Sequence, residues 1–217
     1  MDFTSPTGPV SLDIARVTIA GWTGRDAAAV QHHIDELAAL GIAPPSQVPL
    51  YYRVSANLLT HAATIAVLGA GSSGEAEPLL LRAGGKTWLG LGSDHTDREL
   101  EAHSVAYSKQ ACAKPVAAEV WDLDEVTPHL DDLVLRSWIE DGDDWLPYQE
   151  GTLASIRPLA ELADGAGLAD GDALFCGTLP AIGGVRASAG FRMALEDQVL
   201  GRRIETTYRS EPLPVVS

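Results

Sequence analysis

Residues 75–94 of the chain read EAEPLLLRAGGKTWLGLGSD, and this stretch decides both the local fold and the place of its chemistry. Two apolar runs flank Gly84 and Gly85, which is the pattern of a β-hairpin closed by a two-residue turn. That turn pairs Glu75 with Asp94, with their Cβ atoms about 5 Å apart. Glu77 lies two residues beyond Glu75 on the same strand, so its side chain points to the same face. The sequence therefore predicts that three carboxylates converge at one end of the hairpin.

Carboxylates this close together repel one another unless a cation lies between them. Hard divalent cations such as Mg²⁺, Mn²⁺ or Ca²⁺ prefer carboxylate oxygens and complete their coordination with water and substrate oxygens. We therefore predict that Glu75, Glu77 and Asp94 are metal ligands. The alternative interpretation is a solvated polar strand end, which is what most E-x-E pairs are.

A glycine-rich segment before the hairpin imitates a dinucleotide-binding motif. Residues 65–74 combine an apolar run with G-x-G-x-x-G, and Asp94 follows about 20 residues later. A dinucleotide fold needs a long amphipathic helix after the last glycine, but Pro78 and the Gly84-Gly85 pair interrupt this part of the chain. We therefore expect a glycine-rich corner that leads into a strand.

The composition limits the classes of partner. A chain of 217 residues can form one well-packed domain, which we expect to span residues 1–217. The formal net charge of −15 argues against binding to nucleic acid or anionic membranes. No apolar run is long enough to span a bilayer, and the first residues do not resemble a signal peptide. Cys112 and Cys176 have no metal or redox spacing, so we expect a reduced, cytoplasmic protein.

Short strands dominate the rest of the pattern. The acidic stretch Glu140–Asp144 lacks a calcium-loop pattern and is expected to be a solvated loop. Many strands, few helices and no sustained alternation of the two predict a β-rich α+β domain. We expect strands over 12–20, 48–54, 64–68, 116–123, 133–139, 173–176, 191–195 and 203–208, and helices over 23–41, 152–163 and part of 95–110.

The first predicted helix carries an imidazole beside a carboxylate. Thr23 is its expected cap and Gly41 its expected end. His33 and Glu36 are three residues apart, so they share one face of the helix. A carboxylate that orients an imidazole and raises its basicity is one way to build a water-activating base. The alternative is an exposed His-Glu pair that contributes a few tenths of a kcal/mol to helix stability.

The order of these motifs resembles that of the fumarylacetoacetate hydrolase superfamily, over residues 21–216. The family's H-x-x-E lid helix is similar to His33–Glu36 within residues 23–41, and its metal-binding E-x-E is similar to Glu75–Glu77. Residues 49–53 resemble the family's P-x-x-F-x-K, with Arg53 in place of the lysine. Residues 93–98 resemble N-D-x-(S/T)-x-R, which gives Asp94 the third metal-ligand role.

The later motifs of that family are also present in order. The lysine that follows the third ligand in the family is matched best by Lys109, with Lys114 as the alternative. Gln149 to Thr152 is similar to the end of N-G-x-x-x-Q-x-x-(S/T), and residues 171–183 are similar to G-D-x-(I/L)-x-x-G-T-P-x-G-V-G. Thr178 matches the threonine that binds the substrate carboxylate in the family. Leu179, inserted between Thr178 and Pro180, departs from the family pattern, and His95 has no counterpart in it.

This resemblance implies a mixed β-sandwich roll or distorted β-barrel and a metal-dependent enzyme. The implied reaction is hydrolysis of a carbon–carbon bond in a small 2-oxo or 1,3-dioxo acid similar to an acylpyruvate, in a homodimer. His33, oriented by Glu36, is then the expected base, and Lys109 is catalytic with them. Decarboxylation, keto–enol isomerisation, sugar-acid dehydration and catalytically silent binding of a small acid are the alternatives on the same scaffold. The substrate-binding residues implied in this way are Arg53, Gln149 and Thr178.

Overall fold

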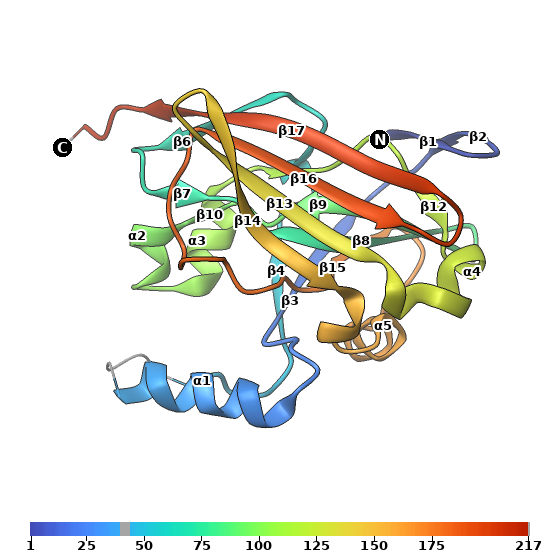
Figure 1. The fold of residues 1–217 in the computed structure, drawn as a ribbon, viewed down its shortest axis with the longest axis horizontal. Helices are drawn as coiled ribbons and strands as arrows, with labels where there is room; N and C mark the ends of the chain where they lie inside the picture. The colour runs from blue at the N-terminus through green and yellow to red at the C-terminus, as the bar shows by residue number, and fades with distance from the viewer. Residues whose placement is uncertain (40–43, 217) are drawn as a thin grey trace.

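Two β-sheets form the body of the protein in the computed structural model, which describes residues 1–39 and 44–216 without the side chains of residues 33, 36, 37 and 39 (Figure 1). Two apolar clusters lie on the two faces of the larger sheet. The larger sheet has the order β12 (Trp121–Asp122), β9 (Lys86–Ser93), β8 (Ala76–Ala83), β15 (Asp172–Phe175), β3 (Arg16–Gly21) and β4 (Leu50–Val54). The smaller has the order β14 (Asp144–Thr152), β13 (Val134–Asp141), β16 (Gly190–Asp197), β17 (Arg202–Leu213) and β6 (Thr64–Leu68).

Short elements surround these sheets. The helices are α1 (Ala27–Ala39), α2 (Arg98–Glu101), α3 (Val105–Ala111), α4 (Leu123–Val126) and α5 (Leu159–Ala166), with 3₁₀ turns at Ala56–Leu58, Thr127–Asp132 and Leu153–Ser155. Three two-stranded pairs complete the fold: β1 (Asp2–Ser5) with β2 (Gly8–Ser11), β7 (Ser72–Ser73) with β10 (Thr96–Asp97), and β5 (Leu59–Thr60) with β11 (Lys114–Pro115). None of the helices in the described residues is long and apolar enough to cross a membrane.

Strand alternation gives the larger sheet two buried faces. On β8, Leu80 belongs to the cluster shared with the smaller sheet, which includes Met193 and Leu195. Its neighbours Leu79 and Leu81 belong to the cluster on the other face. Successive side chains on a strand point to opposite faces, so a strand buried on both sides reads as a continuous apolar run. Odd-numbered positions of β8 therefore point away from the smaller sheet.

The predicted hairpin is confirmed in turn and register. β8 and β9 are antiparallel with Ala76 opposite Ser93, and Gly84 and Gly85 have φ values of +60° and +76°. Positive φ at both turn residues is the geometry that matches the twist of a two-residue hairpin. Beyond the strands, the Asp94 amide donates to the carbonyl of Glu75 at 3.0 Å.

The glycine-rich segment forms a corner, as predicted, and no dinucleotide-type helix follows it. β6 occupies the predicted residues 64–68, and residues 72–73 form β7 directly after the glycines. The α+β, β-rich class is also confirmed, and the described strands form two open sheets rather than a closed barrel. The stretch expected to be a solvated acidic loop is the tight turn of the β13–β14 hairpin.

Three element predictions were wrong for local reasons. Residues 116–120 are not a strand, because the amides of Val116, Ala117 and Val120 bond to three different segments. The helix predicted over 152–163 begins only after Pro158, which has an extended backbone at the helix start. The cap of α1 is Asp26 rather than Thr23, since its carboxylate accepts from the amides of residues 28 and 29. The expected end at Gly41 lies outside the described residues.

Several regular elements, among them the strand β14 and the N-terminal β1–β2 hairpin, have no counterpart among the predictions. The strand β14, which carries Gln149, follows a turn and contains Pro147 where its register with β13 shifts. The N-terminal β1–β2 hairpin contributes Phe3 to the apolar cluster on the face of the larger sheet that points away from the smaller sheet. Both lack the alternating apolar pattern that identifies strands in a sequence.

Candidate functional site

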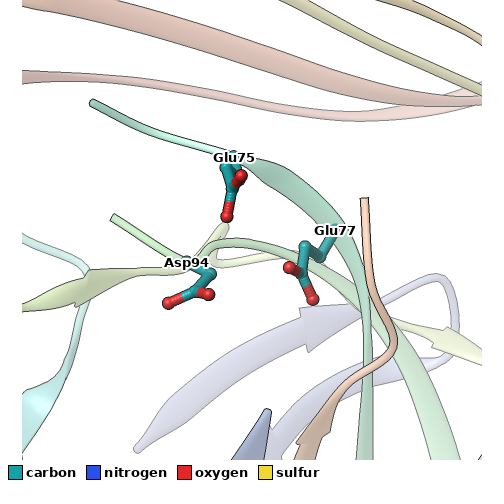
Figure 2. Close-up of side chains that lie close together, drawn as sticks. All are labelled: Glu75, Glu77 and Asp94. Carbon is teal, nitrogen blue, oxygen red and sulfur yellow. The ribbon is translucent and has the colours of Figure 1, made fainter. Parts of the chain in front are cut away.

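The three predicted carboxylates converge at the end of the β8–β9 hairpin. Glu75, Glu77 and Asp94 each offer an oxygen, and these oxygens all lie within 4.8 Å of one another (Figure 2). Glu77 and Asp94 are only 2% and 0% exposed. The side chains lie on the face of the larger sheet that points away from the smaller one, together with Leu79 and Leu81. The register predicted from the Gly84-Gly85 turn thus produces this cluster.

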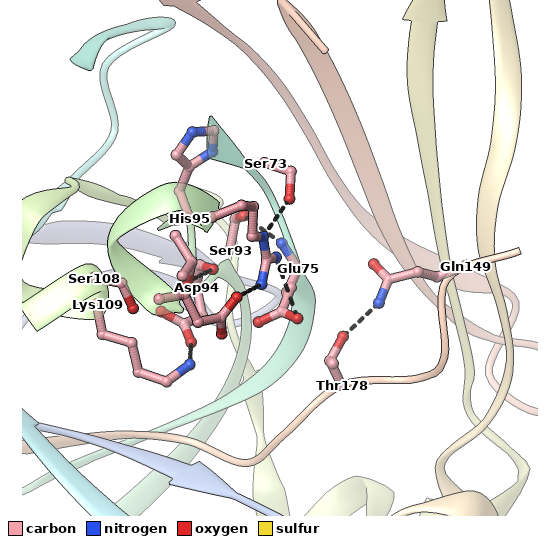
Figure 3. Close-up of polar contacts among 12 residues, drawn as sticks. Ser73, Glu75, Ser93, Asp94, His95, Ser108, Lys109, Gln149 and Thr178 are labelled. Atoms are coloured by element: carbon pink, nitrogen blue, oxygen red, sulfur yellow. Dashed lines mark hydrogen bonds and ion pairs between the residues drawn. The ribbon is translucent and has the colours of Figure 1, made fainter. Parts of the chain in front are cut away.

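Basic residues from the segment after the hairpin pair with two of the carboxylates, and Figure 3 shows Lys109 bonded to Asp94. Asp97 caps α2 by accepting from the amides of residues 99 and 100, which places Arg98 at the start of that helix. The Arg98 Nη2 lies 3.3 Å from Glu75 Oε1. Lys109, from α3, donates to Asp94 Oδ2, and Lys114 Nζ, from β11, lies 3.1 Å from Asp94 Oδ1. Both candidate lysines therefore contact the same carboxylate.

Burial and charge act in opposite directions on these groups. Burial disfavours the charged form of Asp94, but Lys109 and Lys114 outweigh it and lower the pKa of that carboxyl. The pKa of Lys109 is raised, because three carboxylates outweigh its burial. The pKa of Lys114 is lowered, because its burial outweighs the attraction of Asp94. The two ammonium groups thus differ in environment although they share one partner.

Glu77 differs from its two neighbours, and it carries the test of whether a cation fits. In the described part of the chain no lysine or arginine forms an ion pair with it, and its Oε2 accepts only from the Gly177 amide at 2.7 Å. Burial, followed by the charge of Asp94, raises the pKa of Glu77 well above its usual value. Asp94 Oδ1 is also buried without a hydrogen bond. Lys114 Nζ forms an ion pair with Asp94 Oδ1 at 3.1 Å, whereas Glu77 has no ion-pair partner among the described residues. Carboxylate oxygens are hard donors, so the site fits a divalent cation.

The structure separates Arg53 from the carboxylates. Arg53 is exposed on β4, on the same strand face as Tyr51, which packs on the apolar cluster shared by the two sheets. The opposite face of β4 carries Tyr52, whose ring centre lies 5.7 Å from Lys109 Nζ. Burial raises the pKa of Tyr52, which therefore stays a neutral phenol. The residue of this strand that faces the site is Tyr52, and strand alternation in the sequence could have identified it.

Gln149 and Thr178 are brought together, but they contact the hairpin backbone. Gln149 Oε1 accepts from the Ala76 amide at 2.9 Å and from Ser137 at 2.7 Å. Its amide group donates to Thr178 Oγ1 at 2.5 Å and to the carbonyl of Leu179 at 2.7 Å, and Thr178 donates to the carbonyl of Ala76 at 2.8 Å (Figure 3). This network fixes Ala76, which lies between Glu75 and Glu77. Both residues thus hold the strand that carries the carboxylates.

The helix α1 lies beside the site end of the larger sheet. It leaves the sheet after Gly21, at the end of β3, and the chain returns at Leu50, opposite Gly21 on β4. The same end of the sheet carries Glu77, and in Figure 1 α1 lies apart from the two sheets, below β3 and β4. The side chains of His33 and Glu36 lie outside the described residues, so their roles as base and orienting group stay predictions.

His95 is a buried residue whose place the sequence did not indicate. It is 1% exposed, its Nδ1 lies 2.9 Å from the Tyr208 hydroxyl, and its Nε2 lies 2.8 Å from Ser72 Oγ. Burial, then the charges of Lys114 and Arg98, lower its pKa to about 3, so the ring is neutral. Tyr208 lies more than a hundred residues away in sequence, and no local pattern connects the two.

The sequence of the chain matches one known protein family. The sequence profile of a family described as proteins of unknown function, DUF2848, matches residues 20–208. The chain belongs to this DUF2848 family. A search of curated proteins finds no match.

Solved structures show which fold this DUF2848 chain has. A protein from Oleispira antarctica, described as a candidate fumarylacetoacetate isomerase/hydrolase, has a TM-score of 0.68 at 16% identity and covers 97% of this chain and 100% of its own. A 2-keto-3-deoxy-D-arabinonate dehydratase, complexed with magnesium and 2,5-dioxopentanoate, has a TM-score of 0.64 at 15% identity over 93% of this chain and 75% of its own.

A third structure widens the range of reactions on the same fold. The 4-oxalocrotonate decarboxylase from Pseudomonas putida G7, complexed with calcium and acetate, has a TM-score of 0.55 at 16% identity, covering 93% of this chain and 78% of its own. The DUF2848 chain therefore has the fold of the fumarylacetoacetate hydrolase superfamily, as its motif order predicts. At identities of 15–16% this similarity shows the fold alone, and the family shown by the sequence profile is DUF2848.

Proposed function

We propose that this protein is a metal-dependent enzyme that hydrolyses a carbon–carbon bond in a small 2-oxo or 1,3-dioxo acid similar to an acylpyruvate. The observation that carries the proposal is the convergence of Glu75, Glu77 and Asp94 within 4.8 Å, with Glu77 buried and without an ion-pair partner among the described residues. Such a cluster binds Mg²⁺, or Mn²⁺ or Ca²⁺ in its place, through carboxylate oxygens. The three carboxylates are therefore the proposed metal ligands.

The charges around the site favour an anionic substrate. Arg98, Lys109 and Lys114 formally offset the charges of Glu75, Glu77 and Asp94, and Arg98 also pairs with Glu101 at 2.8 Å, so three cations face four carboxylates. A bound divalent cation then leaves an excess of positive charge in a buried place, although the whole chain carries −15. An acid with a carboxylate and a keto or enol oxygen compensates that excess. The dehydratase binds magnesium and 2,5-dioxopentanoate, and the decarboxylase binds calcium and acetate; both of these acids are small carboxylates, which supports this class of ligand.

The residues of this chain have distinct proposed roles. A divalent cation at the three carboxylates supplies Lewis-acid polarisation of the oxygens of the bound acid. Lys109, between Asp94 and the Tyr52 ring, neutralises negative charge on the substrate side. Thr178 is half-buried, and its hydroxyl lies one residue from Gly177, whose amide reaches Glu77. It is the proposed anchor of the substrate carboxylate, positioned by Gln149, and its hydroxyl would then donate to that carboxylate in place of the Ala76 carbonyl.

The helix α1 is the proposed lid, and His33 is the proposed base. Its place at the site end of β3 and β4 allows it to cover the carboxylates and exclude bulk water. His33, oriented by Glu36 on the same helix face, accepts a proton from the water that attacks the second carbonyl. Arg53 has no role in this proposal, because it is exposed on the far face of its strand.

Decarboxylation, isomerisation and dehydration remain alternative reactions for the same site, as does silent binding of a small acid. All of these alternatives place an anionic small acid at the same carboxylates. The homodimer and the cytoplasmic location stay predictions from the sequence, and light scattering of the purified chain measures the first.

The test separates enzyme from silent binder. We expect the protein with Mg²⁺ to catalyse exchange of the C3 protons of pyruvate or oxaloacetate into D₂O, measured by NMR, because polarised oxygens acidify the adjacent C–H. EDTA and Glu77→Gln should abolish the exchange. Asp197→Asn, which changes a buried aspartate outside the site, should preserve it. A protein with demonstrated bound Mg²⁺ and bound oxo acid, but no exchange above the metal-only blank, would contradict the enzymatic proposal.

A further inference from the structure

Asp94 lies between two residues whose side chains contact the same atom. Ser93 Oγ lies 2.8 Å from the hydroxyl of Tyr208, and His95 Nδ1 lies 2.9 Å from it. Neighbouring residues on a strand point to opposite faces, so Ser93 and His95 point to the smaller sheet while Asp94 points to the site. Tyr208 belongs to β17 of that smaller sheet. One hydroxyl therefore fixes the chain on both sides of Asp94.

The same hydroxyl also lies against the chain at Glu75. The Glu75 amide donates to Ser93 Oγ at 3.2 Å, so Ser93 joins Glu75 to Tyr208. A Cβ atom on the preceding residue, Gly74, would lie 2.4 Å from the Tyr208 hydroxyl. Only glycine at position 74 allows this approach, since a Cβ does not come within 3.0 Å of another heavy atom without a shift. Two of the three carboxylates thus depend on one buried contact.

The basic side of the site is connected to this contact through His95. The carbonyl oxygen of His95 accepts from Lys114 Nζ at 2.6 Å, and this ammonium lies 3.1 Å from Asp94 Oδ1. On its far side the His95 ring contacts Ser72 of β7 at 2.8 Å. A shift of His95 would therefore move the anchor of Lys114 together with the backbone of Asp94.

These contacts have no access to water that could replace them. Ser93, His95 and Tyr208 are 0%, 1% and 2% exposed. When one partner of such a group is removed, the other is left buried without a hydrogen bond, which costs about 1–3 kcal/mol unless the chain shifts to recover a partner. A shift of about half an ångström is enough to spoil a ligand set.

We propose that Tyr208 is a positioning residue, whose hydroxyl holds Glu75 and Asp94 at the spacing that a divalent cation needs. The proposal rests on the proposed metal site, to which it adds a residue from the opposite sheet. Partners behind metal ligands typically change metal affinity by roughly 10–100-fold when they are removed. Tyr208 makes its contribution through Ser93 and His95 rather than by contact with the metal or the substrate.

The test compares two buried tyrosines of the same core. Tyr208 and Tyr148 are 2% and 1% exposed, and their rings pack on Phe191 with centroids 5.6 and 6.1 Å away. The Tyr148 hydroxyl accepts from the Arg186 amide at 3.3 Å, and no hydrogen bond among the described residues joins it to Ser93 or His95. Tyr148→Phe therefore removes a matched hydroxyl and serves as the control for Tyr208→Phe.

The measurement is the affinity of the full chain for Mn²⁺ without substrate, by calorimetry, with the electron paramagnetic resonance spectrum of the bound ion. Tyr208→Phe should weaken Mn²⁺ binding by about 10–100-fold and change that spectrum. Tyr148→Phe should stay within about threefold of wild type, because it lies outside the ligand network. Ser93→Ala, which breaks the same link and leaves Tyr208, should reproduce the loss if Tyr208→Phe does not fold.

The outcomes distinguish failure of the positioning role from failure of the proposed metal site. If Tyr208→Phe binds Mn²⁺ with the affinity and the spectrum of the wild-type protein, the positioning role alone is overturned. An equal loss in Tyr148→Phe would also overturn it, because the effect would then be general core damage. A wild-type protein that binds no Mn²⁺ would overturn the proposed function, and the positioning role with it.

Discussion

Asp94 and Asp197 are both buried aspartates, yet the structure compensates their charges in different ways. Asp197, at the end of β16, is 1% exposed. Its Oδ1 accepts from the amides of Val199 and Leu200 at 3.1 and 3.0 Å, and its Oδ2 accepts from Arg202 at 3.2 Å. His129 lies 3.0 Å from Oδ1. Every acceptor of Asp197 has a partner, and the group fixes the turn between β16 and β17.

Asp94 lies in a cluster of three carboxylates that are compensated unequally: Lys109 and Lys114 pair with Asp94, and Arg98 pairs with Glu75. Asp94 Oδ1 has no hydrogen bond, and Glu75 and Glu77 point at the same space. Glu77 is buried, and within the described part of the chain its carboxylate accepts only from the Gly177 amide. The comparison teaches that a buried charge alone does not identify a site, because Asp197 is as buried as Asp94. What distinguishes the site is the convergence of three carboxylates, one of which, Glu77, is buried without an ion-pair partner among the described residues.

The largest expected effect is the loss of turnover when Asp94, rather than Asp197, is replaced. Asp94→Asn should lower the turnover of an acylpyruvate by about 10³-fold or more, since loss of a ligand exceeds the roughly 10–100-fold effect of an outer partner. Asp197→Asn should keep turnover within about threefold at a temperature where it is folded. Steady-state kinetics at saturating Mg²⁺ measure both. Comparable losses in the two variants would mean that burial, rather than the cluster, explains the effect.

The second effect concerns His33 on α1, the proposed lid helix. His33→Ala should lower turnover by about 10²–10⁴-fold, which is the contribution of a general base, and should leave Mg²⁺ affinity unchanged. His32→Ala, on another face of α1, is the matched control and should retain activity. Full activity of the His33 variant would remove that residue from the mechanism while leaving the metal site intact.

The third effect belongs to the structural aspartate. Asp197→Asn should destabilise the fold by about 1–3 kcal/mol at pH 7, because a hydrogen-bonded buried charge is lost. Burial opposes ionisation, but the Leu200 amide, His129 and Arg202 outweigh it and lower the pKa of Asp197 below its ordinary value of 3.8. The contribution is therefore present above that value and is lost as pH falls through the lower folded pKa.

Urea unfolding at a series of pH values checks this prediction. The difference between wild type and Asp197→Asn should be constant near neutral pH and should shrink in strong acid. A difference that grows as the pH falls would show that the sign of the pKa shift is wrong.

The smallest expected effect tests the side of β4 that faces solvent. Arg53→Gln should change stability by no more than about 0.5 kcal/mol, as exposed substitutions do, and turnover by less than about threefold. Tyr52→Leu, one residue away but next to Lys109, should lower turnover more. A strong loss in Arg53→Gln alone would restore the arginine to the substrate site.

The carboxylate cluster was predictable from sequence because its geometry is local. The Gly84-Gly85 turn sets the register, and strand alternation then places Glu75, Glu77 and Asp94 on one face. Arg53 shows the limit of the same rule, since a displacement of one residue along a strand moves a side chain to the other face. Tyr52 takes the position that the motif suggested for Arg53.

Contacts between distant segments could not be predicted. Tyr208 reaches Ser93 and His95 from the opposite sheet, and Gln149 reaches Ala76 from β14. Neither pair has a spacing in the sequence that reports its contact, because sheet packing sets their distance. The fold class needed only strand patterns and motif order, whereas these supporting residues needed the packing of two sheets.

Calorimetric titration of the purified chain with Mg²⁺, in the presence of a small 2-oxo acid, tests the central claim most directly. The account predicts that wild type and Asp197→Asn bind Mg²⁺ at a single site per chain with similar affinity, and that Glu77→Gln loses this binding. Absence of binding in wild type, or binding to Glu77→Gln as tight as to wild type, would contradict the assignment of these carboxylates as a metal site.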